Sequence, residues 1–314
     1  MADKPYISIV IPVYNEELNL PPLMERLYPV MQQIGKPFEI IFTDDGSRDR
    51  SLAILREMAE KFPEVRVIEF NGNFGQHMAI LAAFEESTGE IVITLDADLQ
   101  NPPEEIPKLV KEVEKGHDVV GTIRQKRQDT LFRRVASRIV NITTNKMTGM
   151  QMSDYGCMLR AYHRNVVNNI NRCQETTTFI PALAQTFSAT PTEIEVAHAE
   201  RAEGESKYSL YKLVRLNFDL MTGFSVVPLQ LFALMGILTS LFAVAFAIFL
   251  LVRRFIVGAE VEGVFTLFAI LFFFIGITIF GIGIVGEYVG RVYQEVRKRP
   301  RYVVRKVHGQ HDER

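Results

Sequence analysis

Short apolar runs alternate with longer amphipathic stretches along the N-terminal part of the chain. Five runs rich in β-branched residues predict strands that are buried on both faces: Ile7–Val13, Phe38–Thr43, Val65–Phe70, Ile91–Leu95 and Val119–Gly121. The stretches between them have apolar residues at helical spacing, and we expect helices over Leu18–Ile34, Ser51–Phe62, His77–Ser87 and Pro103–Glu114. This alternation is typical of an α/β domain with a mostly parallel sheet, whose ligands bind beyond the carboxyl ends of the strands.

The alternation ends near residue 122, and two amphipathic stretches follow. Leu131–Met147 carries basic residues among apolar ones, and Tyr208–Met221 has a similar character. Each is compatible with an ordinary surface helix or with a helix that lies in a membrane interface.

Two long uncharged runs lie near the C-terminus. No charged residue occurs between Leu220 and Val252 or between Gly263 and Gly286. Each run is long enough to cross a bilayer as a helix, and core helices of soluble proteins seldom extend so far without a charge. We therefore predict two transmembrane helices, at about 229–252 and 263–286, in preference to a pair of buried core helices.

Positive charge is concentrated on one side of these two helices. Lys and Arg are frequent before the first helix and after the second, while the connector has only Arg253 and Arg254. The positive-inside rule then places the N-terminal domain and the C-terminal tail in the cytoplasm. The expected parts are a soluble domain over 1–206 with an interface helix near 131–147, a juxtamembrane helix over 207–227, a membrane region over 228–286 and a basic tail over 287–314.

Composition narrows the function only by exclusion. The 314 residues include 35 Lys plus Arg and 37 Asp plus Glu. The net charge of −2 excludes the basicity of a general nucleic-acid binder. Cys157 and Cys173 are the only cysteines, which excludes a disulfide scaffold and a zinc ribbon. Gly281, Gly283 and Gly286 spell the dinucleotide pattern GxGxxG, but inside an apolar run they predict close helix packing, as does the Gly286–Gly290 spacing.

Acidic residues follow three of the predicted strands. They are Glu16, the pair Asp44-Asp45, and Asp96 with Asp98. Adjacent carboxylates repel one another, so such a cluster favours a cation or a ligand rich in hydrogen-bond donors. Mg²⁺ and Mn²⁺ bind to a few carboxylates together with water and diphosphate oxygens. A solvated turn with helix caps is the alternative for each acid taken alone.

These motifs resemble a known family. Ile11-Pro12-Val13-Tyr14-Asn15-Glu16, Asp44-Asp45-Gly46-Ser47 and the stretch from Asp96 to Pro103 are similar to the family 2 glycosyltransferases of GT-A fold. The two C-terminal apolar runs narrow the resemblance to the polyprenyl-phosphate glycosyltransferases. Further stretches resemble the bacterial branch that transfers 4-deoxy-4-formamido-L-arabinose. They are Asn73–His77, Val120–Gln125, Asp154–Tyr162, His198–Arg201 and Gly204–Ser209.

The resemblance implies a binding site for the sugar donor. Pro12, Tyr14, Glu16 and Asp45 would hold the nucleotide, with Asp45 accepting from an N–H of the base. Asp96 and Asp98 would bind Mg²⁺ or Mn²⁺ and the diphosphate, with Gln100 close by. The metal would offset the charge of the departing nucleotide diphosphate.

It also implies an acceptor site for a lipid phosphate. Arginine forks onto phosphate oxygens, and the positions that match the family's acceptor-binding residues are Arg133 and Ser137. Arg201, Ser206 and Lys207, in the loop before the first apolar run, and Arg124 are further candidates. Attraction to the membrane surface is the alternative for each basic residue. Asp154 matches the family's catalytic base, yet a phosphomonoester is already mostly ionised at pH 7, so Asp154 is equally compatible with an orienting role.

The implied function is inverting transfer of a sugar from UDP to undecaprenyl phosphate at the bacterial inner membrane. The sugar would be 4-deoxy-4-formamido-L-arabinose, destined for lipid A and polymyxin resistance. The alternatives are a glucosyl- or mannosyltransferase of the same family and a non-catalytic nucleotide-binding scaffold. The absence of Trp excludes the QxxRW signature of processive synthases. The expected partners are the UDP-sugar, undecaprenyl phosphate, the bilayer and further copies of the chain, but no nucleic acid.

Overall fold

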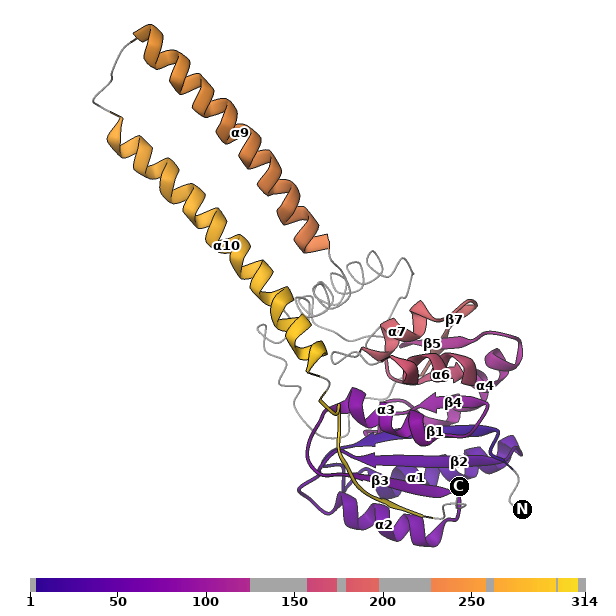
Figure 1. Cartoon of the computed structure of the whole chain (residues 1–314). Helices are drawn as coiled ribbons and strands as arrows, with labels where there is room; N and C mark the ends of the chain where they lie inside the picture. Colours follow the sequence, from indigo (N-terminus) through magenta and orange to yellow (C-terminus); the bar gives the residue numbers. More distant parts are fainter. Residues whose placement is uncertain are drawn as a thin grey trace. The chain divides into compact units, whose positions relative to one another are not determined.

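The computed structural model describes residues 4–124, 157–173, 179–197, 227–257, 263–297 and 299–309 (Figure 1). The chain forms two compact units. One comprises Met1–Ser209 together with Arg299–Arg314, and the other comprises Leu210–Lys298. The first unit is therefore discontinuous in sequence, because the C-terminal segment returns to it after the second unit. The amphipathic stretches predicted near 131–147 and 208–221 lie outside the described residues.

The first part of the chain alternates strands and helices, as the apolar pattern predicts. The elements are β1 (Ile7–Val13), α1 (Leu20–Ile34), β2 (Phe38–Asp44), α2 (Ser51–Lys61), β3 (Val65–Phe70), α3 (Gln76–Glu86), β4 (Ile91–Thr94), the 3₁₀ helix η1 (Pro103–Glu105), α4 (Ile106–Glu114) and β5 (Val119–Arg124). All five predicted strands and all four predicted helices are present. Only their ends differ, since local capping geometry rather than the apolar period sets a terminus.

The strands form one eight-stranded sheet in the order β7-β5-β6-β4-β1-β2-β3-β8. Four strand pairs are parallel: β1–β2, β1–β4, β2–β3 and β5–β7. β6 (Arg160–His163) is antiparallel to both β4 and β5, and β8 (Val304–His308) is antiparallel to β3. The α/β class with a mostly parallel sheet is thus confirmed.

Helices cover both faces of this sheet. Ile7, Ile9 and Ile11 on one face of β1 share a buried core with α1, α2 and α4. α3 contacts β1 and β2 without contributing to that core, so it lies on the other face, where α6 (Arg164–Arg172) contacts β4. The apolar layers on both sides make the central strands a packed scaffold that positions the loops at their ends.

Three strands and two helices were absent from the prediction. They are β6, α6, α7 (Ile180–Thr186), β7 (Pro191–Val196) and β8. β6 contains Arg160, which is fully buried because its Nε donates to the carbonyl of Cys157 at 2.8 Å. β7 contains two glutamates, and β8 reads Val-Arg-Lys-Val-His. Because charged residues interrupt their apolar pattern, the sequence does not predict these strands.

The second unit contains two long apolar helices, α9 (Val227–Val257) and α10 (Val264–Val296). Leu229–Leu250 and Ile270–Val296 are long and apolar enough to cross a membrane, and only 0% and 6% of their most apolar windows are buried. Exposed apolar helices of this length are not core helices, and a bilayer is the surrounding that they require. The unit accordingly associates with a membrane.

Close packing between these helices is confirmed at one of the predicted glycines. A Cβ at Gly281 would lie 1.8 Å from the ring of Phe232, so any larger residue there would require that ring to move. At Gly283, Gly286 and Gly290 a Cβ would meet no atom within 4 Å. The GxGxxG pattern lies inside α10 and does not follow a strand, which rules out a dinucleotide turn.

The segment predicted as a basic tail, 287–314, contributes to two elements instead. α10 continues beyond Gly286 to Val296, and Val304–His308 forms the edge strand β8. β3 needs a partner for the outer row of its backbone N–H and C=O groups, and β8 provides it. Arg305 and His308 also lie within 3.3 Å and 2.9 Å of the Glu69 carboxylate.

Candidate active site

The acids singled out in the sequence converge at one edge of the sheet. β4, β1 and β2 are neighbours and run parallel, so their carboxyl ends lie together. Asp45 N donates to the carbonyl of Val13 at 2.8 Å, and Leu95 N donates to that of Val10 at 3.0 Å. The loops with Glu16, Asp45 and Asp96 therefore start side by side, as expected for a ligand site in a parallel sheet.

The loop after β1 is fastened to the loop after β2. Asn15 has a left-handed backbone (φ 56°), and its N–H donates to Ser47 Oγ at 3.0 Å. Glu16 N donates to Ser51 Oγ at 2.8 Å. Tyr14, between Asn15 and the buried end of β1, keeps 42% of its surface exposed. An exposed aromatic ring on a fixed loop offers a flat surface for a nucleotide base.

Asp44 and Asp45 end β2, and both are almost fully buried. Asp45 accepts from the backbone N–H groups of Phe74 (2.6 Å) and Gly75 (2.9 Å), and Asp44 accepts from Ser47 N at 3.3 Å. Burial raises the pKa of both carboxyl groups above the usual range for aspartate, although these hydrogen bonds oppose the rise. Within the described part of the chain, neither acid forms a salt bridge. Among the described residues Asp45 is therefore a buried acid without a cationic partner, a common feature of ligand sites.

The loop between β3 and α3, residues 71–75, connects the two acidic groups and was assigned no role from the sequence. Asn73 Nδ2 donates to the carbonyl of Asp45 at 3.1 Å. At the start of α3, Gln76 Nε2 donates to Asp96 Oδ1 at 2.7 Å. In the sequence, only the resemblance of the stretch Asn73–His77 to the family pointed to this loop, because Asn, Gly and Gln are uncharged and do not stand out as site residues.

Close backbone contact explains one glycine of this region. Gly46 has φ +71°, and a Cβ on it would lie 2.7 Å from the backbone carbon of Gly72. A larger residue at 46 would push apart the loops after β2 and β3. The two loops hence act as one structure around Asp45.

Burial alternates along the Asp96-Ala97-Asp98 triplet. Ala97 is buried, with 4% of its surface exposed, while Asp96 and Asp98 on either side are partly exposed. Gln100 N donates to Asp98 Oδ1 at 3.2 Å, and Leu99 takes a left-handed φ of 61° that turns the chain. Both carboxylates thus reach the surface of the acidic edge of the sheet.

These carboxylates fit a metal that is bound jointly with a ligand. In the described ranges no group of three or more His, Cys, Asp or Glu side chains has a metal-binding arrangement. A complete protein cage is therefore not formed by these residues. Mg²⁺ and Mn²⁺ commonly bind to one or two carboxylates and complete their coordination with phosphate oxygens and water, which suits Asp96 and Asp98.

The predicted acceptor residues are only partly described. Arg124 ends β5, which runs parallel to β4 through the antiparallel β6, so its backbone lies toward the same edge of the sheet. The remaining predicted acceptor and catalytic residues lie outside the described part of the chain. They are Arg133, Ser137, Asp154, Arg201, Ser206 and Lys207.

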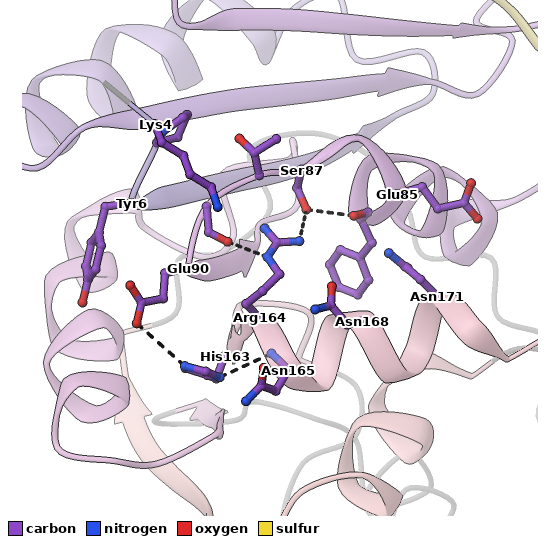
Figure 2. A pocket seen from close by; sticks show the side chains of 14 residues that line it. Lys4, Tyr6, Glu85, Ser87, Glu90, His163, Arg164, Asn165, Asn168 and Asn171 are labelled. Atoms are coloured by element: carbon purple, nitrogen blue, oxygen red, sulfur yellow. Dashed lines mark hydrogen bonds and ion pairs between the residues drawn. The ribbon is translucent and has the colours of Figure 1, made fainter. Parts of the chain in front are cut away.

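A cavity of about 710 Å³ lies at the opposite, amino end of the strands (Figure 2). It is lined by residues that precede β1 and β4 and by the start of α6, among them Lys4, Glu90 and His163, and by no predicted site residue. Arg164 extends across it and donates to Gly89 O (2.6 Å) and Ser87 Oγ (3.0 Å), contacts that fasten α6 to the α3–β4 connection. Because parallel sheets bind ligands at the carboxyl ends of strands, we assign the active site to the acidic edge and not to this cavity.

Comparison with known proteins shows the family of the chain. Residues 8–170 match the family model Glycosyl transferase family 2. The chain is 53% identical over 304 residues to the undecaprenyl-phosphate 4-deoxy-4-formamido-L-arabinose transferase of Pectobacterium atrosepticum, covering 96% of this chain and 93% of that protein. It is 52% identical to the protein of the same name from Pseudomonas aeruginosa, covering 97% and 92%.

A solved structure shares the fold. Glucosyl-3-phosphoglycerate synthase from Mycobacterium tuberculosis, in complex with Mn²⁺, UDP and phosphoglyceric acid, has a TM-score of 0.52 and 15% identity, covering 69% of this chain and 76% of that one. The same enzyme with Mn²⁺, UDP-glucose and phosphoglyceric acid has a TM-score of 0.51 at 16% identity, covering 69% and 78%. At this identity the similarity concerns the fold alone.

Proposed function

The chain belongs to glycosyl transferase family 2, and on this basis we propose that it transfers 4-deoxy-4-formamido-L-arabinose from UDP to undecaprenyl phosphate. The names of relatives that are about half identical over nearly the whole chain support the choice of donor and acceptor. The acidic edge of the sheet carries the proposal structurally. There, the β3–α3 loop and Gln76 link the buried Asp45 to the Asp96-Ala97-Asp98 triplet.

The nucleotide occupies the part of the site formed by β1 and β2. The exposed ring of Tyr14 lies against the base, and Pro12 and Glu16 belong to the same strand end and loop. Asp45 accepts from a base N–H, which suits uracil. Because its carboxylate already accepts from two backbone N–H groups, its orientation is fixed before the donor arrives.

The diphosphate lies over Asp96 and Asp98, with Gln100 beside them. A divalent cation bound there, Mg²⁺ or Mn²⁺, supplies Lewis-acid stabilisation of the charge that develops on the leaving UDP. Asp96 and Asp98 hold their carboxylates at the protein surface for this purpose, and Gln76 fixes Asp96 by donating to its Oδ1.

The transfer is a single displacement. A phosphate oxygen of the lipid attacks the anomeric carbon, the bond between that carbon and the β-phosphate oxygen breaks, and UDP leaves with the bonding electrons. The configuration at the anomeric carbon is inverted. Basic and hydroxyl side chains position the acceptor phosphate. They are those of Arg124, Arg133, Ser137, Arg201, Ser206 and Lys207. Asp154 orients the acceptor or serves as a base; because the phosphate is mostly ionised at pH 7, orientation is the larger part of its role.

The proposed location follows from the second unit. α9 and α10 cross the bacterial inner membrane, and the family 2 domain and both termini are cytoplasmic, in accordance with the distribution of Lys and Arg. The acceptor has an apolar polyprenyl tail, so its phosphate is available only at the membrane surface. The lipid-linked sugar then serves lipid A modification and polymyxin resistance, and the enzyme acts as a homo-oligomer.

Product analysis with the full chain in detergent tests this function. The purified protein is incubated with undecaprenyl phosphate, Mg²⁺ or Mn²⁺, and one donor at a time: UDP-4-deoxy-4-formamido-L-arabinose, UDP-glucose or GDP-mannose. Mass spectrometry of the lipid fraction is expected to detect the arabinose product. Formation of only a glucosyl or mannosyl lipid would assign a different donor, and UDP binding without any lipid product would favour a non-catalytic scaffold.

A further inference from the structure

The segment between α10 and β8 lies against the loop that holds Asp45. We call residues Arg299–Val303 the C-terminal strap. The ring of Tyr302 stacks on the ring of Phe70, the last residue of β3, with centroids 5.1 Å apart and an interplanar angle of 14°. The next residue of each segment is joined by a backbone hydrogen bond, from Asn71 N to Val303 O, at 2.9 Å. The strap thus supports the β3–α3 loop at its first residue.

The contact continues through the loop to the acidic site. Phe70 packs edge-on against Phe74, with centroids 5.6 Å apart and an interplanar angle of 90°. The N–H of Phe74 donates to Asp45 Oδ1 at 2.6 Å, and the adjoining N–H of Gly75 donates to Asp45 Oδ2 at 2.9 Å. An unbroken series of contacts therefore leads from Tyr302 to Asp45.

The position of Tyr302 is fixed from its other side. Burial and a hydrogen bond with Glu85 raise the pKa of the Tyr302 phenol, so it stays protonated at neutral pH. Arg301 lies 3.8 Å from the same Glu85 carboxylate. With its hydroxyl held by α3 and its ring on Phe70, Tyr302 has little freedom to move away from the loop.

We propose that Tyr302 is a positioning residue for donor binding, acting through Phe70 and Phe74 to keep the β3–α3 loop in the conformation that orients Asp45. This inference rests on the proposed function, in which Asp45 holds the nucleotide. The aromatic series reaches Asp45 directly through the N–H groups of Phe74 and Gly75, whereas the triplet is reached only through the side chain of Gln76, on the first turn of α3. Loss of the stack thus affects the affinity for UDP and the UDP-sugar and spares the turnover of bound substrates.

Three variants of the full chain separate this role from simple support of the fold. Tyr302→Ala removes the ring, Tyr302→Phe keeps the stack and loses the hydroxyl, and Arg305→Ala removes a β8 contact with Glu69 but leaves the stack intact. We expect Tyr302→Ala to raise the Kd for UDP and the KM for the UDP-sugar about tenfold, the upper range for losing one aromatic pair. Its kcat and its KM for undecaprenyl phosphate should stay close to those of the unsubstituted protein.

Tyr302→Phe should restore donor affinity, and Arg305→Ala should leave it unchanged. Hydrogen exchange gives a second readout that does not require activity: the amides of Phe74 and Gly75 should exchange faster in Tyr302→Ala than in Tyr302→Phe. Tyr302→Leu replaces Tyr302→Ala if the latter fails to fold, with the same expectations.

Two results would overturn the inference. One is an unchanged Kd for UDP in Tyr302→Ala or Tyr302→Leu. The other is a lower kcat, a higher KM for both substrates and a lower melting temperature together, none of them rescued by Tyr302→Phe. That pattern indicates general support of the fold. If the unsubstituted protein fails to bind UDP, the proposed function itself is wrong, and this outcome is recognised before any variant is compared.

Discussion

Buried acids at the two ends of the sheet have pKa values shifted in opposite directions. At the amino end, Glu39 is 5% exposed; at the carboxyl end, Asp45 is 3% exposed. Burial opposes the charge of Glu39, but the Arg66 guanidinium and hydrogen bonds from Ser8 and Thr88 lower its pKa below the usual range. Burial raises the pKa of Asp45, and its hydrogen bonds from backbone N–H groups do not reverse the rise.

The difference separates a stabilising network from a binding site. The partners of Glu39 compensate its charge within the protein, since Arg66 forms an ion pair with it and Ser8 Oγ donates to it at 2.6 Å. Asp45 has no cationic partner among the described residues, and its raised pKa favours a proton or a hydrogen-bond donor from a ligand. This arrangement lowers the stability of the folded state and strengthens ligand binding, as is usual at functional sites.

The largest expected effect concerns the carboxyl end. Asp98→Asn removes one carboxylate of the metal site, and we expect the rate of transfer to fall by about 10³-fold or more, because charge stabilisation on the leaving group contributes several kcal/mol. The melting temperature should stay within error, since Asp98 is partly exposed. Glu57→Gln, an exposed acid on α2, is the matched control and should leave the rate unchanged. Equal rates for Asp98→Asn and Glu57→Gln would remove the acidic triplet from the mechanism.

The next effect concerns the amino end. Glu39→Gln leaves Arg66 buried without its main carboxylate, which should reduce the stability of the family 2 domain by about 3 kcal/mol. Thermal unfolding in detergent measures this, and the KM for the UDP-sugar of the folded protein should not change. Because the folded pKa of Glu39 is lowered, its contribution is complete above the pKa of the unfolded state and is lost as the pH falls through the folded pKa. The difference in stability should therefore shrink below about pH 4.

Asp45→Asn provides a smaller effect and a direct comparison with Glu39→Gln. An asparagine has one acceptor oxygen where Asp45 has two, so the N–H of Phe74 or Gly75 loses its partner. We expect the Kd for UDP, measured by titration, to rise about tenfold, as is typical for one hydrogen bond to a charged group. An unchanged Kd would exclude Asp45 from nucleotide binding.

The smallest effect should have the opposite sign. Asp44→Asn removes a charge whose folded pKa is raised by burial and by the nearby Glu69 carboxylate. A raised pKa means that the contribution of Asp44 to stability is present below the unfolded pKa and is lost as the pH rises through the folded pKa. The variant should be more stable than the unsubstituted protein at pH 7, by about 1 kcal/mol, and this gain should vanish near pH 4 and below. Its Kd for UDP should match the unsubstituted value, which makes it the control for Asp45→Asn.

The sequence by itself determined the central strands, the helices between them and the two apolar helices. These elements have strong apolar periods, because the strands are buried on both faces and the helices on one, or are exposed to lipid. It also located Asp45, Asp96 and Asp98 at strand ends. In a parallel sheet all carboxyl ends meet at one edge, so positions far apart in sequence come together by topology alone.

Only the tertiary structure decided where the charged strands and the neutral loop residues belong. Arg160 of β6 is buried with its Nε donating to a backbone carbonyl. β8, near the C-terminus, pairs with β3 and completes that edge of the sheet. Gln76 and Tyr302 acquire their roles through contacts with residues distant in sequence, Gln76 with Asp96 and Tyr302 with Phe70 and Glu85. The pKa values of Glu39 and Asp45 differ for the same reason: apolar periodicity is a property of the local chain, whereas hydrogen bonds and ion pairs depend on partners that folding brings from elsewhere.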